Sequence, residues 1–188
     1  MSAGLVLAAG AGTRFGGRIK QLAPLRGRPL LEHAVEAMLA VPALDPVLVV
    51  LGHAADEILR SASLGEAEVV VCREWERGQS ASLRCGVAEL RDADAVVVTL
   101  GDQPFITAQV IAGALDHLGG RYDAVRTMYD GMPGHPVVLS RRVMDAIPEL
   151  EGDQGARELL SRFRVRRWEA GHLCSAADVD TQEELSRL

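Results

Sequence analysis

Four runs of consecutive aliphatic residues constrain the fold of this chain more than any other feature. Such runs, unlike alternating patterns, indicate strands that are buried on both faces. Segments with helical periodicity separate them, the clearest at residues 29–40. This alternation predicts an α/β fold, a doubly wound and mostly parallel sheet with helices on both faces. The runs occupy residues 4–9, 46–52, 67–72 and 93–102.

The second half of the chain continues the pattern with shorter elements. A chain of 188 residues without an internal repeat, a low-complexity segment or a linker predicts one domain over residues 1–188. Further strands are expected at 123–129, 135–140 and 165–170, and helices at 54–63, 82–90, 107–118, 141–147, 156–163 and 181–188.

Charge and cysteine content narrow the class of protein. Twenty basic and 26 acidic side chains give a net charge of −6, which argues against binding of nucleic acid or an anionic membrane through the overall field. Three widely spaced cysteines without a C-x-x-C pair do not predict a disulfide framework or a zinc site. The first residues have no basic segment and too short an apolar run for a signal or membrane helix. We therefore expect a soluble, cytoplasmic protein.

A glycine-rich, cationic loop follows the first aliphatic run. Residues 10–20 contain four glycines, Arg14 and Lys20, and no acidic residue. Glycines let backbone N–H groups converge on an anion, and the two cations can neutralise phosphate oxygens. In open α/β sheets ligands bind beyond the carboxyl ends of the strands, where this loop is expected. The loop favours phosphate binding; a glycine-rich turn with two solvated cations is the alternative.

This loop differs from two common phosphate-binding motifs. The dinucleotide fingerprint G-x-G-x-x-G fits at Gly10 and Gly12 but has Phe15 in place of the third glycine. No acidic residue closes the second aliphatic run, where that motif needs a ribose ligand. The Walker A spacing fits Gly12 and Gly17, but Arg18 follows where the motif has lysine.

Carboxylates at the same edge of the sheet predict a magnesium site. Asp102 is the last residue of the fourth run and lies just past its aliphatic residues, in a turn where it could also bond only to its own backbone. Asp178 and Asp180 are two residues apart and point the same way on an extended segment. Asp180 could instead belong only to the cap of the last helix, where Thr181 and Glu184 have capping-box spacing. Magnesium binds one or two carboxylates together with substrate phosphates.

Six segments in order carry a resemblance to a known family. The chain resembles the molybdenum cofactor cytidylyltransferases, within the nucleotidyltransferases that are similar to molybdopterin-guanine-dinucleotide synthase. It departs from the family pattern by one extra residue between Gly16 and Lys20 and by Gln182 in place of proline. The segments are "LAAGAGTRFGGRIKQLAPLRGRPLLEHAV", "WERGQSASLRCGV", "LGDQPFIT", "GHPVVLSR", "GDQGARELL" and "DVDTQEEL".

The resemblance implies a Rossmann-like nucleotidyltransferase fold and Mg²⁺-dependent transfer of CMP from CTP to the terminal phosphate of molybdopterin, with release of pyrophosphate. Arg14, Lys20 and Asp102 would be catalytic, and Asp102 and Asp180 would bind the metal. An acceptor phosphate that is already ionised needs no general base, so positioning and electrostatics would suffice. The implied nucleotide-binding residues are Leu7, Ala8, Ala9, Gly10, Gly12, Arg14, Lys20, Gly78, Gln79, Ser80 and Ser82.

The acceptor site and the choice of base are less constrained. Gly134, His135 and Pro136 could line the pterin pocket, although a loop histidine without a function is the commoner case, and Arg157 is a candidate cation for the acceptor. The alanine at position 9 could narrow the base pocket in favour of a pyrimidine. Related enzymes that use GTP or a sugar or alcohol phosphate remain alternatives, as does a non-catalytic protein that delivers the cofactor. A transient contact with a molybdoenzyme or its maturation factor is also expected.

Overall fold

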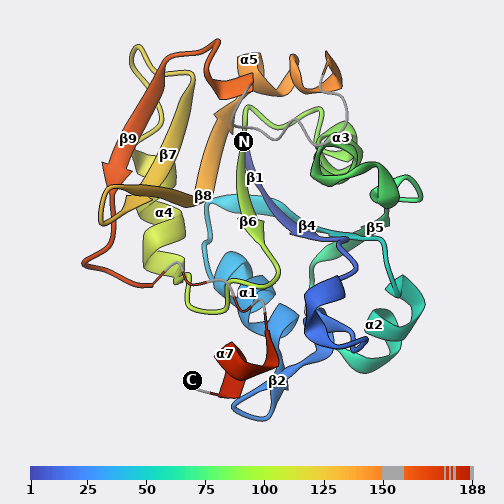
Figure 1. Cartoon of the computed structure of the whole chain (residues 1–188). Coiled ribbons are helices and arrows are strands. Elements are labelled where there is room, and N and C mark those ends of the chain that lie inside the picture. Colours follow the sequence, from blue (N-terminus) through green and yellow to red (C-terminus); the bar gives the residue numbers. More distant parts are fainter. Residues whose placement is uncertain (150–158, 176, 178, 180, 187–188) are drawn as a thin grey trace.

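A seven-stranded sheet forms the centre of the computed structural model, which describes residues 1–149, 159–175, 177, 179 and 181–186 (Figure 1). The order of the strands across the sheet is β5-β4-β1-β6-β8-β7-β9. The strands are β1 (Ser2–Ala8), β4 (Leu44–Leu51), β5 (Glu68–Val71), β6 (Ala95–Leu100), β7 (Ala124–Tyr129), β8 (Met132–Ser140) and β9 (Val165–Glu169).

All neighbouring strands of this sheet pair in parallel except at β8, which is antiparallel to both β6 and β7. The exception has a local cause. Asp130 and Gly131 connect β7 to β8, and both have positive φ angles, 51° and 78°. Two such residues form the tight turn that joins antiparallel strands. The expected doubly wound, mostly parallel sheet is therefore confirmed, with one strand reversed by an Asp-Gly hairpin.

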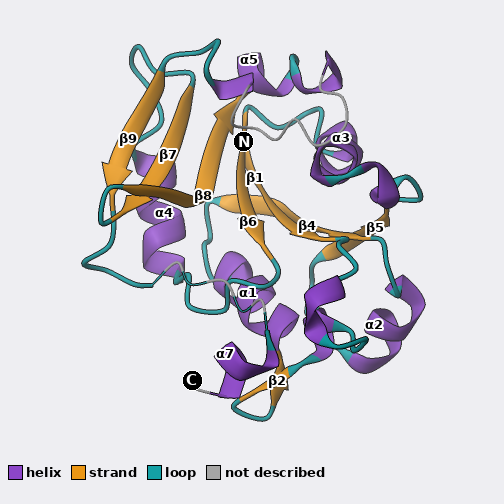
Figure 2. Ribbon diagram, in the orientation of Figure 1, coloured by secondary structure: helices purple, strands orange, loops and turns teal. Residues whose placement is uncertain are grey.

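Helices cover both faces of the sheet (Figure 2). On one face α1, α2 and α4 pack on a core that includes Val6, Val49 and Val97. On the other face α3 and α5 pack on a core that includes Leu5, Val50 and Val98. Successive residues of one strand point into opposite cores, so residues on both faces of the strand are buried. This explains the continuous aliphatic runs of the sequence. The helices are α1 (Leu30–Leu39), α2 (Ala55–Ser61), α3 (Gln79–Glu89), α4 (Ala108–Asp116), α5 (Arg141–Met144) and α7 (Gln182–Ser186).

Short elements fill the connections at the carboxyl edge. The glycine loop contains the 3-10 turns η1 (Thr13–Phe15) and η2 (Lys20–Leu22), and η3 (Trp75–Arg77) precedes α3. A small hairpin, β2 (Pro24–Leu25) with β3 (Arg28–Pro29), was not expected from the sequence. The remaining 3-10 turn is η4 (Ile147–Glu149). Among the described residues no helix is long and apolar enough to cross a membrane.

The boundaries of several predicted helices differ from the prediction; α5, for example, ends at Met144 and not at residue 147. Helix α3 begins at Gln79, three residues earlier than expected, because Gly78 adopts a φ of 99° that ends the preceding turn. Of the helix predicted over 156–163, the first three residues lie outside the described residues, Leu159 and Leu160 are helical, and the chain turns at 161–163.

The predicted capping box of the last helix is present. Glu184 N–H donates to Thr181 Oγ1 at 3.2 Å, and Thr181 N–H donates to Glu184 Oε2 at 3.0 Å.

Candidate functional site

Two charged residues 82 positions apart meet at the carboxyl edge of the sheet. Strands β1 and β6 are neighbours and pair Leu7 with Leu100 near their ends. The loop after β1 carries Lys20, and the turn after β6 carries Asp102. Lys20 Nζ donates to Asp102 Oδ2 at 2.7 Å. The two residues that the sequence analysis assigned to the triphosphate and to the metal are therefore in direct contact.

Lys20 is the only lysine of the sequence, whose other basic side chains are all arginines. The residue is 7% exposed, so its aliphatic stem is buried while the ammonium group reaches Asp102. The loop must come very close to this stem at Gly12. Gly12 has a φ of 56°, and a Cβ atom there would lie 2.9 Å from Lys20 Cβ. A glycine at this position is thus required both by the backbone angle and by the lysine.

The carboxylate of Asp102 is only half satisfied. Oδ2 accepts the bond from Lys20, whereas Oδ1 is buried and has no hydrogen-bond partner among the described residues. A buried carboxylate oxygen without a partner is costly unless a cation or donor binds it. An oxygen ligand of this kind fits a divalent metal ion such as Mg²⁺. The structure therefore provides one suitable metal ligand in Asp102.

The C-terminal segment around Val179 contacts the turn that carries Asp102. Val179 N–H donates to the carbonyl oxygen of Asp102 at 3.1 Å, and the Val179 side chain is fully buried beside Phe15 and Leu30. Asp178 and Asp180 themselves lie outside the described residues. The backbone contact at Val179 connects the C-terminal segment to the turn that carries Asp102.

A glutamine that the sequence analysis did not single out fixes the start of the glycine loop. The Gln21 side chain is 6% exposed, and its Nε2 donates to the carbonyl oxygens of Ala8 at 2.9 Å and Gly10 at 2.8 Å. These two bonds hold the end of β1 against η2, directly beside Lys20. No simple sequence signal distinguishes this buried glutamine from a solvated loop residue.

Replacing Gln21 by Glu is expected to destabilise the protein by about 2 kcal/mol or more at neutral pH, because a carboxylate would face two carbonyl oxygens. A protonated carboxyl can still donate one bond, so the pKa of the new side chain rises on folding and the loss grows as pH increases. Urea unfolding at pH 5 and pH 8 measures this. The exposed Gln109 at the start of α4 provides the matched control, Gln109→Glu. Equal stability of both variants at pH 8 would contradict the role of Gln21.

A pocket of about 340 Å³ lies beside the Lys20–Asp102 pair. This volume is within the range of small-ligand sites. Residues from the end of β1, from the turn after β6 and from the start of α3 line it. The positive end of the α3 dipole favours an anionic ligand. The lining residues are Leu7, Ala9, Gly10, Ala11, Trp75, Glu76, Gly78, Gln79, Ser82, Leu100 and Asp102.

Most of the residues expected to bind the nucleotide line this pocket, and some do not. Ala8 belongs to the core on the opposite face of the sheet. Ser80 is 1% exposed inside α3, and Gly12 supports Lys20 from behind. The backbone of Arg14 is in η1, but its side chain lies outside the description, as does Arg157.

Trp75 belongs to the wall of this pocket. Its ring meets the His53 ring edge-on, with centroids 5.3 Å apart, and it lines the pocket. The close packing of this corner explains Gly52 after β4. A Cβ atom on Gly52 would lie 2.6 Å from Trp75 Cβ and 2.8 Å from the Ala9 carbonyl oxygen. The tryptophan thus packs closely on the corner formed by Gly52 and Ala9, and it lines the pocket there.

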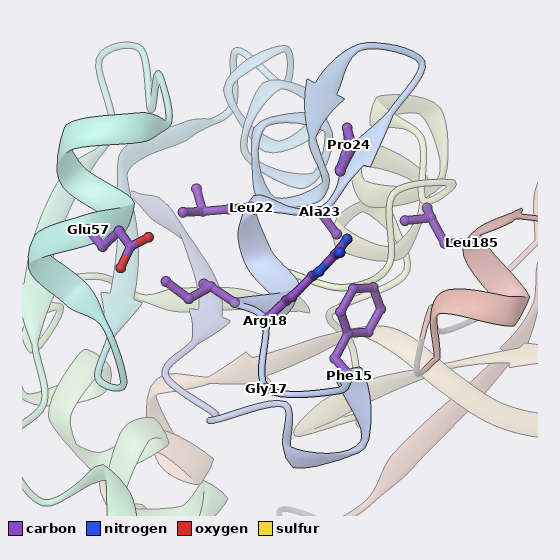
Figure 3. Close-up of a pocket in the computed structure, with 9 residues that line it drawn as sticks. Phe15, Gly17, Arg18, Leu22, Ala23, Pro24, Glu57 and Leu185 are labelled. Atoms are coloured by element: carbon purple, nitrogen blue, oxygen red, sulfur yellow. The ribbon is translucent and has the colours of Figure 1, made fainter.

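A larger pocket of about 640 Å³ lies elsewhere along the glycine loop (Figure 3). Figure 3 shows Arg18 extending between Phe15 and Ala23, with Glu57 of α2 across the pocket. Its walls are mainly apolar, and neither Asp102 nor the start of α3 contributes to them. We therefore assign the chemistry to the smaller pocket, which contains the carboxylate.

The residues expected at the acceptor site lie in β8. The hydroxyl of Tyr129 donates to the carbonyl oxygen of His135 at 2.6 Å, and Thr127 Oγ1 donates to that of Pro136 at 2.7 Å. Burial and the positive charge of Arg126 lower the pKa of His135 to about 3. Its imidazole is thus neutral at physiological pH, and adjacent Gly134 is half-buried.

Comparison with known families gives the same interpretation of the fold. Residues 4–168 match the MobA-like NTP transferase domain. The chain belongs to this family. The match includes the glycine loop, Asp102 and the β7–β8 hairpin, but ends before the C-terminal segment that carries Asp180.

Relatives of this family member cover nearly its whole length. Nicotine blue oxidoreductase from Paenarthrobacter nicotinovorans is 34% identical over 98% of this chain and 95% of its own. The crystal structure of Rv0371c from Mycobacterium tuberculosis H37Rv superposes with a TM-score of 0.87 at 32% identity, over 99% of this chain and 95% of that one. Rv0371c has also been crystallised with manganese.

A more distant structure shares the fold alone. Molybdopterin-guanine dinucleotide biosynthesis protein A from Archaeoglobus fulgidus superposes with a TM-score of 0.72 at 22% identity, over 100% of this chain and 96% of that one. The predicted resemblance is confirmed at the level of the family by the match to the MobA-like NTP transferase domain.

Proposed function

We propose that this protein is a Mg²⁺-dependent cytidylyltransferase that transfers CMP from CTP to the terminal phosphate of a molybdopterin-type cofactor and releases pyrophosphate. The observation that carries the proposal is the contact between Lys20 and Asp102 beside a pocket of nucleotide size, in a member of an NTP transferase family. A metal-bound triphosphate requires a cation for its phosphates and a carboxylate oxygen for the metal, and Lys20 and Asp102 supply both side by side.

The negative charge of the triphosphate determines which side chains the reaction needs. A nucleoside triphosphate carries about four negative charges, which repel an anionic nucleophile from the α-phosphorus. An oxygen of the acceptor phosphate forms the new bond to that phosphorus, and the bond to the oxygen that bridges to the β-phosphorus breaks. Lys20 and Arg14 would offset the charge of the departing pyrophosphate. No side chain has to remove a proton, since the acceptor phosphate is ionised at neutral pH.

Asp102 and Asp180 would hold the metal ion. The buried Oδ1 of Asp102, which has no partner among the described residues, supports this assignment, and Rv0371c crystallises with manganese. The bound ion would neutralise triphosphate charge and orient the phosphates. In this arrangement Lys20 keeps Asp102 in position through Oδ2 while Oδ1 remains available.

The base and ribose would occupy the pocket between the end of β1 and the start of α3. Ala9 and Trp75 are both lining residues, and an alanine at position 9 would leave less room for the base than a glycine. A site narrowed in this way favours a pyrimidine over a purine. Gly78, Gln79 and Ser82 would supply backbone and side-chain hydrogen bonds.

A thermal-shift series with CTP, GTP, ATP and UTP, each with and without Mg²⁺, tests the proposal. A ligand at 100 times its Kd stabilises the folded state by about 2.7 kcal/mol. The largest shift is expected for CTP and only with Mg²⁺, followed by pyrophosphate release once a molybdopterin-type acceptor is added. A larger shift with GTP would contradict the role of Ala9. CTP binding without pyrophosphate release would favour a protein that delivers the cofactor.

The similarity to nicotine blue oxidoreductase raises a second candidate, a redox activity. Its support is a 34% identity that extends over nearly both whole chains. Against it, β4 is followed by Gly52 and not by an acid that could bind the ribose of a dinucleotide. NADH and NADPH belong in the same thermal-shift series. A shift with either that exceeds the shift with CTP would favour the oxidoreductase.

A further inference from the structure

The nucleotide pocket carries a second carboxylate on the wall that η3 and α3 form. The two acidic residues among its lining residues are Asp102 and Glu76. Asp102 contacts Lys20, on the side that would hold the metal and the triphosphate. Glu76 lies instead in η3, directly after Trp75. A carboxylate repels phosphates, so the position of Glu76 suits the uncharged part of a nucleotide.

Glu76 lies on the side of the pocket where the base would be bound. Its neighbour Trp75 packs on the same corner as Ala9, since a Cβ atom on Gly52 would lie 2.6 Å from Trp75 Cβ and 2.8 Å from the Ala9 carbonyl oxygen. Both Trp75 and Ala9 line the pocket. A base that contacts Ala9 therefore has an edge within reach of the Glu76 side chain.

Several backbone carbonyl oxygens of the pocket walls already accept hydrogen bonds. Those of the glycine loop accept from Gln21 Nε2 and from His53 N–H, and those of η3 and the start of α3 accept from N–H groups of their own turns. A donor group on the base therefore finds its better acceptors among the side chains. The bonded carbonyl oxygens belong to the lining residues Ala9, Gly10, Trp75 and Gly78.

The polar side chains of the η3–α3 wall differ in what they can distinguish. Amide and hydroxyl groups both donate and accept, so Gln79 and Ser82 can bond to an amino group or to a keto oxygen. An ionised carboxylate only accepts. Cytosine has an amino donor at C4, where uracil has an oxygen acceptor. Glu76 is thus the group of this wall that favours cytosine and disfavours uracil.

We propose that Glu76 selects CTP over UTP by accepting a hydrogen bond from the amino group at C4 of cytosine. This inference rests on the proposed function and deepens it. Ala9 would separate pyrimidines from purines, and Glu76 separates the two pyrimidines. Because Glu76 would lie away from the reacting phosphates, its replacement is expected to raise KM for CTP and to leave kcat within about twofold.

The test is isothermal titration calorimetry of the full chain with CTP, UTP and 2′-deoxy-CTP, each with Mg²⁺. Wild-type protein is expected to bind CTP about tenfold more tightly than UTP. Glu76→Gln keeps the size of the side chain and can also donate to the uracil oxygen, so the ratio is expected to fall below about threefold. The Glu76 side chain is exposed, so the variant is expected to keep the melting temperature of wild type.

Glu74→Gln is the matched control, because it makes the same change two residues away. Glu74 pairs with Arg77 at 3.1 Å and is not a lining residue of the pocket. This control is expected to keep the wild-type ratio of CTP to UTP affinity. An equal loss of selectivity in Glu74→Gln would overturn the inference, as would wild-type protein that binds CTP and UTP equally or an unchanged ratio in Glu76→Gln.

Binding of the ribose by Glu76 would give a different result. Glu76→Gln would then weaken CTP and UTP equally and remove the difference between CTP and 2′-deoxy-CTP, which also overturns the inference. Pyrophosphate release with CTP and a molybdopterin-type acceptor, measured on the same wild-type sample, separates the two proposals. Release with an unchanged ratio in Glu76→Gln refutes the role of Glu76 alone. A lowered ratio without release in wild type refutes the transferase alone.

Discussion

Replacing Asp102 by Asn is expected to reduce pyrophosphate release from CTP by roughly 10³-fold or more. The variant keeps the shape of the side chain but removes the charge that would bind the metal. It also leaves Lys20 without its anionic partner at 2.7 Å. Turnover measured over a range of Mg²⁺ concentrations is the appropriate assay, because a lost metal ligand also shifts the metal dependence to higher concentrations.

Asp92→Asn makes the same chemical change at an exposed position in the loop after α3 and serves as the control. The control is expected to retain full turnover and an unchanged melting temperature. Asp102→Asn is expected to remain folded, since the Asp102 side chain is 28% exposed and water can bind the new amide. Turnover of Asp102→Asn within threefold of wild type would refute the metal assignment.

Replacing Lys20 by Met is expected to lower kcat by about 10²–10³-fold. Methionine retains the buried aliphatic stem that Gly12 contacts and removes only the ammonium group. The expected loss is in kcat more than in KM, because the charge on the leaving pyrophosphate is greatest in the transition state. Steady-state kinetics with CTP and Mg²⁺ measures both constants.

The absence of other lysines gives Lys20 an independent test. An amine-acylating reagent can modify only this side chain and the N-terminal amine, so mass spectrometry of the modified protein reports on Lys20 directly. CTP with Mg²⁺ is expected to protect Lys20 from acylation and to leave the N-terminal amine reactive. Arg60→Met, on an exposed position of α2, is the control for the kinetics. An unchanged kcat in Lys20→Met would locate the triphosphate elsewhere.

Local sequence signals predicted the elements of the fold well, because each signal is a property of neighbouring residues. The aliphatic runs gave the strands that are buried on both faces, and Thr181 with Glu184 gave the capping box that the structure contains. The direction of β8 was not distinguished, although Asp130 and Gly131 are a typical hairpin pair. The short hairpin β2–β3 has only two residues in each strand, too few for a periodic pattern.

Two residues of the candidate site were singled out from the sequence for the same reason. Lys20 and Asp102 were recognised because each follows an aliphatic run, at the edge where ligands of α/β sheets bind. Their mutual contact, the buried bonds of Gln21 and the position of Trp75 in the pocket depend on residues that are distant in the sequence. Nothing in a local pattern contains that information.

The sequence by itself determined the layered α/β architecture, and it placed a glycine-rich cationic loop after the first aliphatic run and a carboxylate at the end of the fourth. Only the tertiary structure decided which charges meet. Pairing of β1 with β6 brings Lys20 to Asp102, and pairing of β7 with β9 places Arg126 beside Arg167. The reason is physical: periodicity reports which face of an element is buried, whereas electrostatic contacts depend on the order and register of the strands.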